Sequence, residues 1–246
     1  MNSARDHYDG LLGSIYSWML GDWETVLQEA RDELRDLGIG GASSTGGVAI
    51  DLGAGTGAHS IPLAELDYSV VAVDTCAVLL EELKGRIAGH DIHPVLGDLL
   101  SFRSFHPGMA DVILCMGDTL THLGEPEDVE ELFHHVKAAL APGGLFVATF
   151  RDYSAAPPEG TARFIPVRSD EHRILTCFLE YRDASVMVHD LLHSRSPSGW
   201  ETRVSAYPKL RLEPQALKAS LYRLGLTARL EPGPRGMVRL TAAASR

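Results

Sequence analysis

One short stretch, Val48–Ala58 (VAIDLGAGTGA), constrains the fold of this chain more than any other. It begins with a short apolar run, which is typical of a buried strand, and glycines follow at positions 53, 55 and 57. Glycine has no Cβ atom, so alternate glycines expose bare backbone at the start of the next helix, where N–H groups point toward a ligand. The pattern therefore predicts a strand, a nucleotide-binding loop and a helix, in that order.

Apolar runs of strand length alternate with helical segments over the following hundred residues. The runs lie at 48–52, 70–73, 93–96, 112–115 and 145–150, and helical patterns lie between them at 77–87 and 128–140. Short, almost wholly apolar strands separated by helices are typical of a parallel sheet that is covered on both faces. We therefore predict a doubly wound, Rossmann-like α/β domain.

The pattern differs on either side of this region. Residues 1–40 carry apolar and aromatic positions at helical spacing, which predicts two helices broken near Gly21, and a Gly/Ser-rich linker follows at 38–47. After Phe150, three extended segments at 173–181, 185–193 and 200–212 follow one another without helices, which indicates an antiparallel meander. A helix from Glu213 to Leu224 and a hairpin over 226–243 complete the chain.

We therefore expect a single domain over residues 1–246. Its predicted parts are an N-terminal helical lid (1–40), a cofactor-binding core (41–150), an antiparallel insertion that covers the substrate (163–212), and a C-terminal helix and hairpin (213–246).

Charge and composition exclude several classes of partner. The chain has 22 Lys and Arg against 33 Asp and Glu, a net charge of −11, and no basic run, so we expect neither nucleic acid nor a membrane as a partner. No apolar stretch is long enough to cross a bilayer or to serve as a secretion signal, which favours a cytoplasmic location. The sequence does not define the oligomeric state, for which a homodimer is one candidate.

We also expect no metal site and no disulfide framework. The three cysteines are odd in number and lack Cys-x-x-Cys spacing. His134 and His135 are adjacent on a predicted helix and point in different directions, so they cannot share an ion.

Two cofactor classes compete for the glycine loop. Gly53, Gly55 and Ala58 match the dinucleotide fingerprint, and Asp74 lies 21 residues after Gly53, where a ribose-binding acid belongs. Asp51 favours instead a nucleotide cofactor that carries an ammonium group, because a carboxylate at the end of the strand suits an ammonium group better than a pyrophosphate.

The acidic-x-Gly-x-Gly-x-Gly pattern of residues 51–57 resembles the first motif of the class I S-adenosylmethionine-dependent methyltransferases. Further segments similar to motifs of that family follow in order at 71–74, 96–99, 111–118 and 142–144. The resemblance covers nearly all of residues 48–150. It implies S-adenosylmethionine as cofactor and a seven-stranded sheet with an N-terminal helical lid and an antiparallel β insertion after the fifth strand.

The resemblance also implies which residues hold the cofactor. Asp74 would bind the two ribose hydroxyls, and Asp98 with the following N–H would meet the adenine. For both, a helix cap is the alternative role. The expected cofactor contacts are Tyr8, Tyr16, Asp51, Gly53, Gly55, Gly57, Asp74, Thr75, Asp98, Leu99 and Met116.

The segment 115–123 indicates the acceptor. It lacks the Asn/Asp-Pro-Pro-Tyr/Phe motif of base methylation and is similar to the loop of glycine- and sarcosine-type N-methyltransferases, with Asp118 where these usually carry Asn. We expect Asp118 to attract an amine or accept its proton, and we take His122 and Tyr16 as further catalytic candidates. The alternatives are an exposed, capping Asp118 and a His122 packed under the loop.

Two residues after the fifth strand are candidates for substrate binding. Arg151 and Tyr153 would lie at the carboxyl edge of the sheet, where doubly wound folds bind substrates, although a surface ion pair of Arg151 with Asp152 is the alternative. Arg173, Tyr181, His189 and Trp200 of the insertion are possible lining residues, among which the sequence makes no choice.

The sequence thus predicts a methyltransferase that transfers a methyl group to a nitrogen of a small molecule by in-line displacement. O-methylation of a small metabolite is the alternative within the family. From other classes, an NAD(P)-dependent oxidoreductase and a non-catalytic nucleotide-binding subunit stay open.

Overall fold

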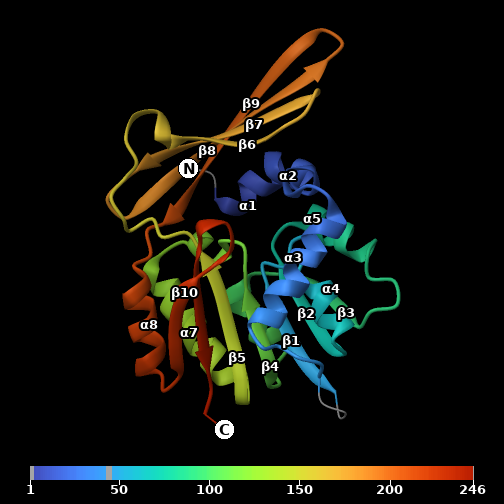
Figure 1. Ribbon diagram of the computed structural model, residues 1–246, viewed down its shortest axis with the longest axis vertical. Coiled ribbons are helices and arrows are strands. Elements are labelled where there is room, and N and C mark those ends of the chain that lie inside the picture. The colour runs from blue at the N-terminus through green and yellow to red at the C-terminus, as the bar shows by residue number, and fades with distance from the viewer. Residues whose placement is uncertain (1–2, 43–45, 246) are drawn as a thin grey trace.

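The largest element of the computed structural model, which describes residues 3–42 and 46–245, is a seven-stranded sheet (Figure 1). Its strand order is β10-β11-β5-β4-β1-β2-β3, in which β1 to β5 are parallel and β11 is antiparallel to β5. The doubly wound sheet and the C-terminal hairpin are therefore confirmed. The strands are β1 (Gly47–Leu52), β2 (Tyr68–Asp74), β3 (Ile92–Leu96), β4 (Ala110–Cys115), β5 (Leu140–Phe150), β10 (Thr227–Pro232) and β11 (Val238–Ala243).

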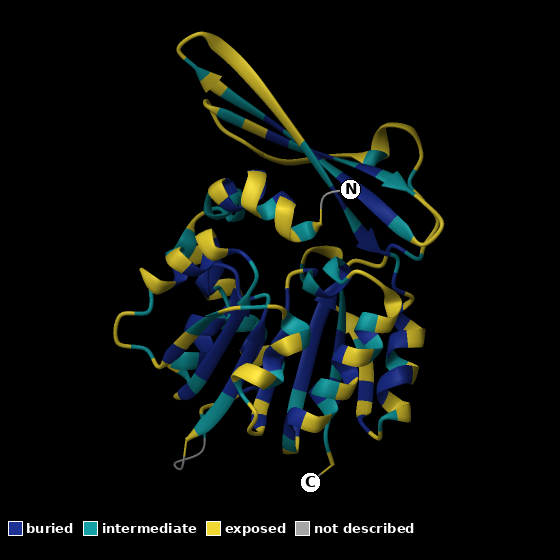
Figure 2. Cartoon of the chain, turned by 180° about the vertical axis from the view of Figure 1, so that it is seen from behind, coloured by how far each residue is buried: buried dark blue, intermediate teal, exposed yellow. Residues whose placement is uncertain are grey.

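Helices cover both faces of this sheet, as the apolar strands predict. One face packs against α3 (Trp23–Asp36), α4 (Ser60–Glu65) and α5 (Ala77–Lys84), and the other against α6 (Phe102–Phe105), α7 (Pro126–Ala139) and α8 (Pro214–Arg223). Successive residues of a strand point to opposite faces, so Ile50 joins one apolar cluster and its neighbour Ala49 the other. Figure 2 shows the resulting buried strands in dark blue.

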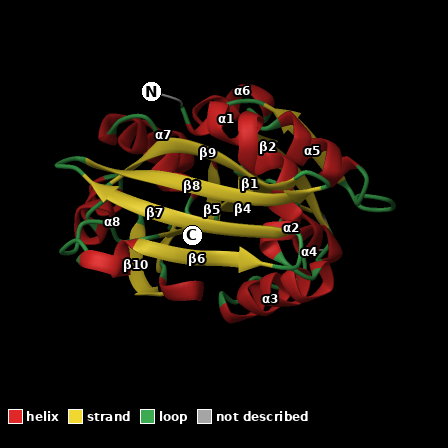
Figure 3. Ribbon diagram, turned by 90° about the horizontal axis from the view of Figure 1, so that it is seen from above, coloured by secondary structure: helices red, strands yellow, loops and turns green. Residues whose placement is uncertain are grey.

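A second sheet lies over the carboxyl ends of the parallel strands (Figures 1 and 3). It consists of β6 (Phe164–Ser169), β7 (Arg173–Tyr181), β8 (Ser185–Ser196) and β9 (Gly199–Leu210), antiparallel in sequence order, and we call it the cover sheet. The predicted meander is thus confirmed, and β6 is an additional strand. It escapes prediction because it is an exposed edge strand interrupted by Pro166.

The N-terminal segment lies between the two sheets. We use the name lid for residues 4–20 only, because α3, which the predicted lid of residues 1–40 included, packs on the core sheet instead. It passes from α1 (Ala4–His7) through a π-helical turn (Tyr8–Leu12) and a 3-10 turn (Gly13–Ile15) to α2 (Tyr16–Leu20). Leu11, Leu12 and Ile15 pack against Leu175 and Leu192 of the cover sheet. The predicted break is present at Gly21, whose φ of +109° no other residue type adopts readily.

Some predicted boundaries are wrong. β5 begins at Leu140 instead of residue 145, because Leu140 pairs with Ala110 of β4 before a register shift between the two strands. Helix α5 ends at Lys84 instead of residue 87. Residues 43–45 of the predicted linker lie outside the described residues. No helix in the described ranges is long and apolar enough to cross a membrane.

Candidate active site

The glycine loop joins β1 to α4 at the carboxyl edge of the core sheet. Gly53, Gly55 and Gly57 all have left-handed φ values of +78°, +53° and +90°. A Cβ atom on Gly53 would lie 2.5 Å from Thr119, and one on Gly57 would lie 2.3 Å from Leu83, so packing against these side chains requires both glycines. A Cβ atom on Gly55 would meet only Tyr16 and Leu79, at 3.6 and 3.9 Å, so this glycine has more room.

A cavity of about 300 Å³ opens beside this loop, between the ends of the core strands and the lid. The structure brings most of the predicted cofactor and catalytic residues together there: Tyr8, Tyr16, Gly53, Gly55, Asp74, Thr75, Asp98, Leu99, Met116 and His122. Asp51, Gly57 and Asp118 are absent from the lining. Among the lining residues that the prediction missed are Ser3, Ala4, Arg5, Leu79 and Asp128, whose sequence context gives no signal of a ligand. The prediction also missed Thr119, which lines the cavity, although it lies in the predicted segment 115–123.

Two carboxylates of the lining also organise the backbone. Asp74 accepts hydrogen bonds from the N–H groups of Gly55 at 2.7 Å and Cys76 at 2.8 Å, so it ties the glycine loop to the end of β2. Burial raises the pKa of Asp74 above its usual value. Asp98 caps the short helix that follows it by accepting from the N–H of Leu100 at 2.8 Å. Asp98 therefore both caps this helix and lines the cavity.

Asp51 does not line the cavity. Its carboxylate is buried, accepts a 2.6 Å hydrogen bond from the Ser60 hydroxyl, and has a pKa that burial raises. The structure therefore does not show this side chain in the place expected for contact with an ammonium group.

Tyr8, Tyr16 and His122 form an aromatic wall of the cavity. The Tyr8 ring lies 5.8 Å, centroid to centroid, from both Tyr16 and His122. The Nε2 atom of His122 is buried and has no hydrogen-bond partner in the described part of the chain. Burial, together with the charge of Lys209, lowers the pKa of His122 to about 3, so this ring is neutral and has hydrogen-bonding capacity to spare.

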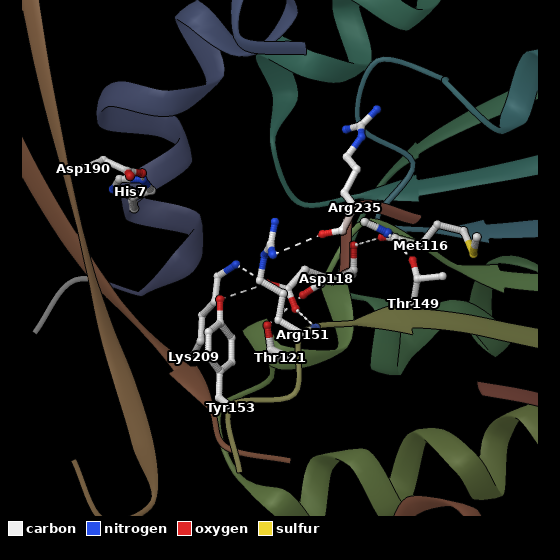
Figure 4. A network of polar contacts seen from close by, with 12 residues as sticks. His7, Met116, Asp118, Thr121, Thr149, Arg151, Tyr153, Asp190, Lys209 and Arg235 are labelled. Atoms are coloured by element: carbon white, nitrogen blue, oxygen red, sulfur yellow. Dashed lines mark hydrogen bonds and ion pairs between the residues drawn. The ribbon is translucent and has the colours of Figure 1, made fainter. Parts of the chain in front are cut away.

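Asp118 lies in a buried ion pair (Figure 4). Its Oδ2 is 2.5 Å from Nζ of Lys209, its Oδ1 accepts from the N–H of Arg151 at 2.8 Å, and the Tyr153 hydroxyl lies 3.5 Å away. The alternative of an exposed, capping Asp118 is wrong, because the residue is 4% exposed and its side chain makes no cap hydrogen bond. No sequence pattern indicates Lys209 as the partner, since it lies 91 residues further along the chain.

The two predicted substrate-binding residues lie outside the cavity lining. Arg151 is exposed, and Nη1 of its side chain lies 3.5 Å from the Arg235 carbonyl oxygen. The alternative ion pair with Asp152 is not formed, since Asp152 instead accepts from the N–H and hydroxyl of Ser154. Tyr153 is buried beneath Asp118.

The cover sheet approaches the aromatic wall through a different residue from those considered in the sequence. Arg173, Tyr181, His189 and Trp200 do not line the cavity. Tyr207 of β9 instead lies 5.5 Å, centroid to centroid, from the His122 ring. Across residues 3–42 and 46–245, no three His, Cys, Asp or Glu side chains converge as a metal site requires.

Comparison with known proteins agrees with this geometry. Residues 49–144 match the family described as "Methyltransferase domain". Glycine/sarcosine N-methyltransferase of Halorhodospira halochloris is 29% identical over 161 residues, which are 63% of this chain and 59% of that protein. Cypemycin N-terminal methyltransferase of a Streptomyces species is 35% identical over 101 residues, 40% of each chain. This chain therefore spans about three fifths or less of the length of these curated relatives.

Solved structures share the fold over almost the whole chain. The sugar N-methyltransferase from Streptoalloteichus superposes with a TM-score of 0.74 at 13% identity, over 97% of this chain and 94% of that one. The amino pentose methyltransferase from Micromonospora echinaspora gives 0.74 at 17% identity, over 94% and 96%. At these identities the superpositions show a shared fold. The family match over residues 49–144 favours the methyltransferase interpretation of the glycine loop over the dinucleotide one.

Proposed function

We propose, from the premise that this chain belongs to the class I S-adenosylmethionine-dependent methyltransferases, that it methylates a nitrogen atom of a small molecule. The observation that carries the proposal is His122, which lines the same cavity as the glycine loop and whose Nε2 is buried without a hydrogen-bond partner among the described residues. A neutral imidazole nitrogen accepts a hydrogen bond, and an amine acceptor presents an N–H donor. Two of the relatives named above, the glycine/sarcosine N-methyltransferase and the sugar N-methyltransferase, carry nitrogen methylation in their names, which supports the same class of acceptor.

The residues around the cavity suit S-adenosylmethionine, which supplies an activated methyl group on a positively charged sulfur when it is bound. The carboxylate of Asp74 has lone pairs left for two ribose hydroxyls, beyond the hydrogen bonds it accepts from Gly55 and Cys76. Asp98 and Leu99 lie at the end of β3, where adenine binding is proposed. The bare backbone of Gly55 lets a ligand approach closely.

The protein's own contribution is to orient the acceptor and to exclude water. Tyr8 and Tyr16 present aromatic faces, which attract positive charge through cation–π interaction. Nε2 of His122 accepts the N–H of the acceptor and so directs the nitrogen lone pair. Because the pKa of His122 is about 3, the ring orients the amine and is a poor final acceptor of its proton.

Asp118 takes a different role in this proposal from the one expected from the sequence. Its charge is balanced by Lys209 at 2.5 Å, so it is not a free base. Its contribution is to hold the loop that carries His122.

Calorimetric titration with S-adenosylmethionine, S-adenosylhomocysteine, NADH and NADPH tests the cofactor class. We expect binding of the two sulfur nucleosides, weakened in Asp74→Ala and unchanged in Asp91→Ala, which removes an exposed carboxylate at the other end of the sheet. Binding of the nicotinamide cofactors alone would overturn the proposal.

Formation of S-adenosylhomocysteine with paired acceptors then tests the chemistry. Each pair consists of an amine and the alcohol in which a hydroxyl replaces that amine. Turnover of the amines supports nitrogen methylation, turnover of the alcohols supports O-methylation, and cofactor binding without turnover of a broad amine series indicates a non-catalytic subunit.

A further inference from the structure

We propose that Lys209, on the cover sheet, is a positioning residue that holds the cofactor loop in place through Asp118. The cofactor loop is defined here as residues 116–122, of which Met116, Gly117, Thr119 and His122 line the cavity. The inference rests on the proposed function in one respect, since it takes this loop as a wall of the S-adenosylmethionine site.

The backbone of the cofactor loop turns left-handed near its start, which is unfavourable for Asp118. Gly117 has φ of +72° and Asp118 φ of +76°, a left-handed region that a residue with a Cβ atom seldom occupies. Thr149 on β5 supports this turn from below, because its hydroxyl accepts from the N–H of Gly117 and its carbonyl from that of Asp118, both at 2.9 Å. Such a conformation persists only where its surroundings hold it.

The side chain of Asp118 stabilises this turn from the opposite side. Its two oxygens accept from the N–H of Arg151 and from the ammonium group of Lys209 (Figure 4). The side chains of Asp118 and Lys209 are 6% and 10% exposed, and a charge buried to this degree requires an opposite charge beside it. Burial alone would lower the pKa of Lys209, but the Asp118 carboxylate raises it above its ordinary value, so the lysine stays charged.

The same strand contacts the other end of the cofactor loop. Tyr207 precedes Lys209 by two residues and so shares its face of β9. The Tyr207 ring lies 5.5 Å from that of His122 and stacks at 4.1 Å on His7 of the lid. Strand β9 therefore contacts the loop at Asp118 and at His122, and it contacts the lid as well, so it sets the position of one cavity wall relative to the other.

Substitution Lys209→Met tests this role, with Lys84→Met on the exposed face of α5 as the control that removes a surface ion pair of similar type. Hydrogen exchange of residues 116–122 and of the Arg151 amide reports the loop directly, and calorimetry reports the affinity for S-adenosylhomocysteine. We expect faster exchange at these positions and an affinity lowered about tenfold in Lys209→Met, with no change in Lys84→Met.

Unchanged loop exchange together with an affinity within twofold of the parent would overturn the proposal, even if the melting temperature fell. If Lys209→Met does not fold, the double variant Asp118→Asn/Lys209→Met, which leaves no charge unpaired, carries the same measurement, and native-like exchange of its loop would equally overturn the proposal. If the parent protein binds no S-adenosylhomocysteine, the proposed function fails, while the exchange data still decide whether Lys209 holds the loop.

Discussion

Nε2 of His7, at the start of the lid, lies 2.9 Å from Oδ2 of Asp190 on the inner face of the cover sheet. Nδ1 of the same ring is 2.8 Å from the Ser205 hydroxyl, and the imidazole is fully buried. Both ring nitrogens are thus engaged by the cover sheet, and the next residue of the lid, Tyr8, lines the cavity. The cover sheet therefore fixes the position of the lid from above.

Replacement of His7 by Ala should loosen the lid. It leaves the buried Asp190 carboxylate without its partner, which we expect to lower the free energy of unfolding by about 2–3 kcal/mol in urea denaturation. The affinity for S-adenosylhomocysteine should fall as well, because Tyr8 loses its anchor. Ser14→Ala, which removes an outer hydrogen bond of the same lid, should change neither quantity appreciably. Equal effects of the two substitutions would argue against the anchoring role.

Asp51 is the penultimate residue of β1 and Asp74 the last residue of the neighbouring β2, yet we expect opposite consequences when each is changed to Asn. Asp74→Asn should weaken binding of S-adenosylhomocysteine at least about tenfold, because the lining carboxylate is lost. Asp51→Asn should bind within about threefold of the parent. Burial raises the pKa of Asp51, so its charged form opposes folding above that pKa, and the neutral amide should be at least as stable at pH 8. Calorimetry and thermal melts measure both effects, and a larger loss of affinity in Asp51→Asn would contradict the geometry.

Gly57 supports packing and does not line the cavity. In Gly57→Ala the new Cβ would lie 2.3 Å from Leu83 and would force a left-handed φ on alanine, so we expect a loss of about 2–4 kcal/mol in the free energy of unfolding. Gly38→Ala is the matched control, since Gly38 has φ of +71° but no atom within 4 Å of the added methyl group. Similar losses in the two variants would show that the contact with Leu83 contributes nothing. The double variant Gly57→Ala/Leu83→Ala should lose less than the sum of its two single changes.

The sequence predicted those parts of the site that depend on local patterns. The glycine loop is a strand-to-helix connection, and Asp74 and Asp98 follow strands, so topology alone brings them to one edge of the core sheet. Lys209 could not be predicted in this way. Its position depends on the register of β9 against β8 and on which face of β9 points inward, and a shift of one residue would turn Lys209 away from Asp118.

The position of Asp118 illustrates the same limit. A loop residue that follows a strand is usually solvated, and nothing near it in the sequence indicates a buried partner. Only the cover sheet, inserted after β5 and folded back over the strand ends, makes it an interior residue. The sequence thus predicts where Asp118 lies in the core fold. It does not predict that a distant segment of the chain buries this carboxylate and pairs it with a lysine.

His122 should make the protein sensitive to acid. The pKa of an unfolded histidine is about 6.5, and burial lowers that of His122 to about 3 in the folded protein. Between these values the unfolded chain binds a proton that the folded chain does not, so the free energy of unfolding falls as the pH is lowered, by up to about 1.4 kcal/mol per pH unit from this group alone. In His122→Asn this contribution disappears, and urea denaturation from pH 7 to pH 4.5 should show a shallower loss of stability than in the parent. His93→Asn, which removes an exposed imidazole, is the control for the substitution itself. If the free energy of unfolding falls equally steeply with pH in His122→Asn and in the parent, His122 takes up its proton in the folded protein. The imidazole would then not stay neutral, and the proposed orientation of the acceptor amine would fail with it.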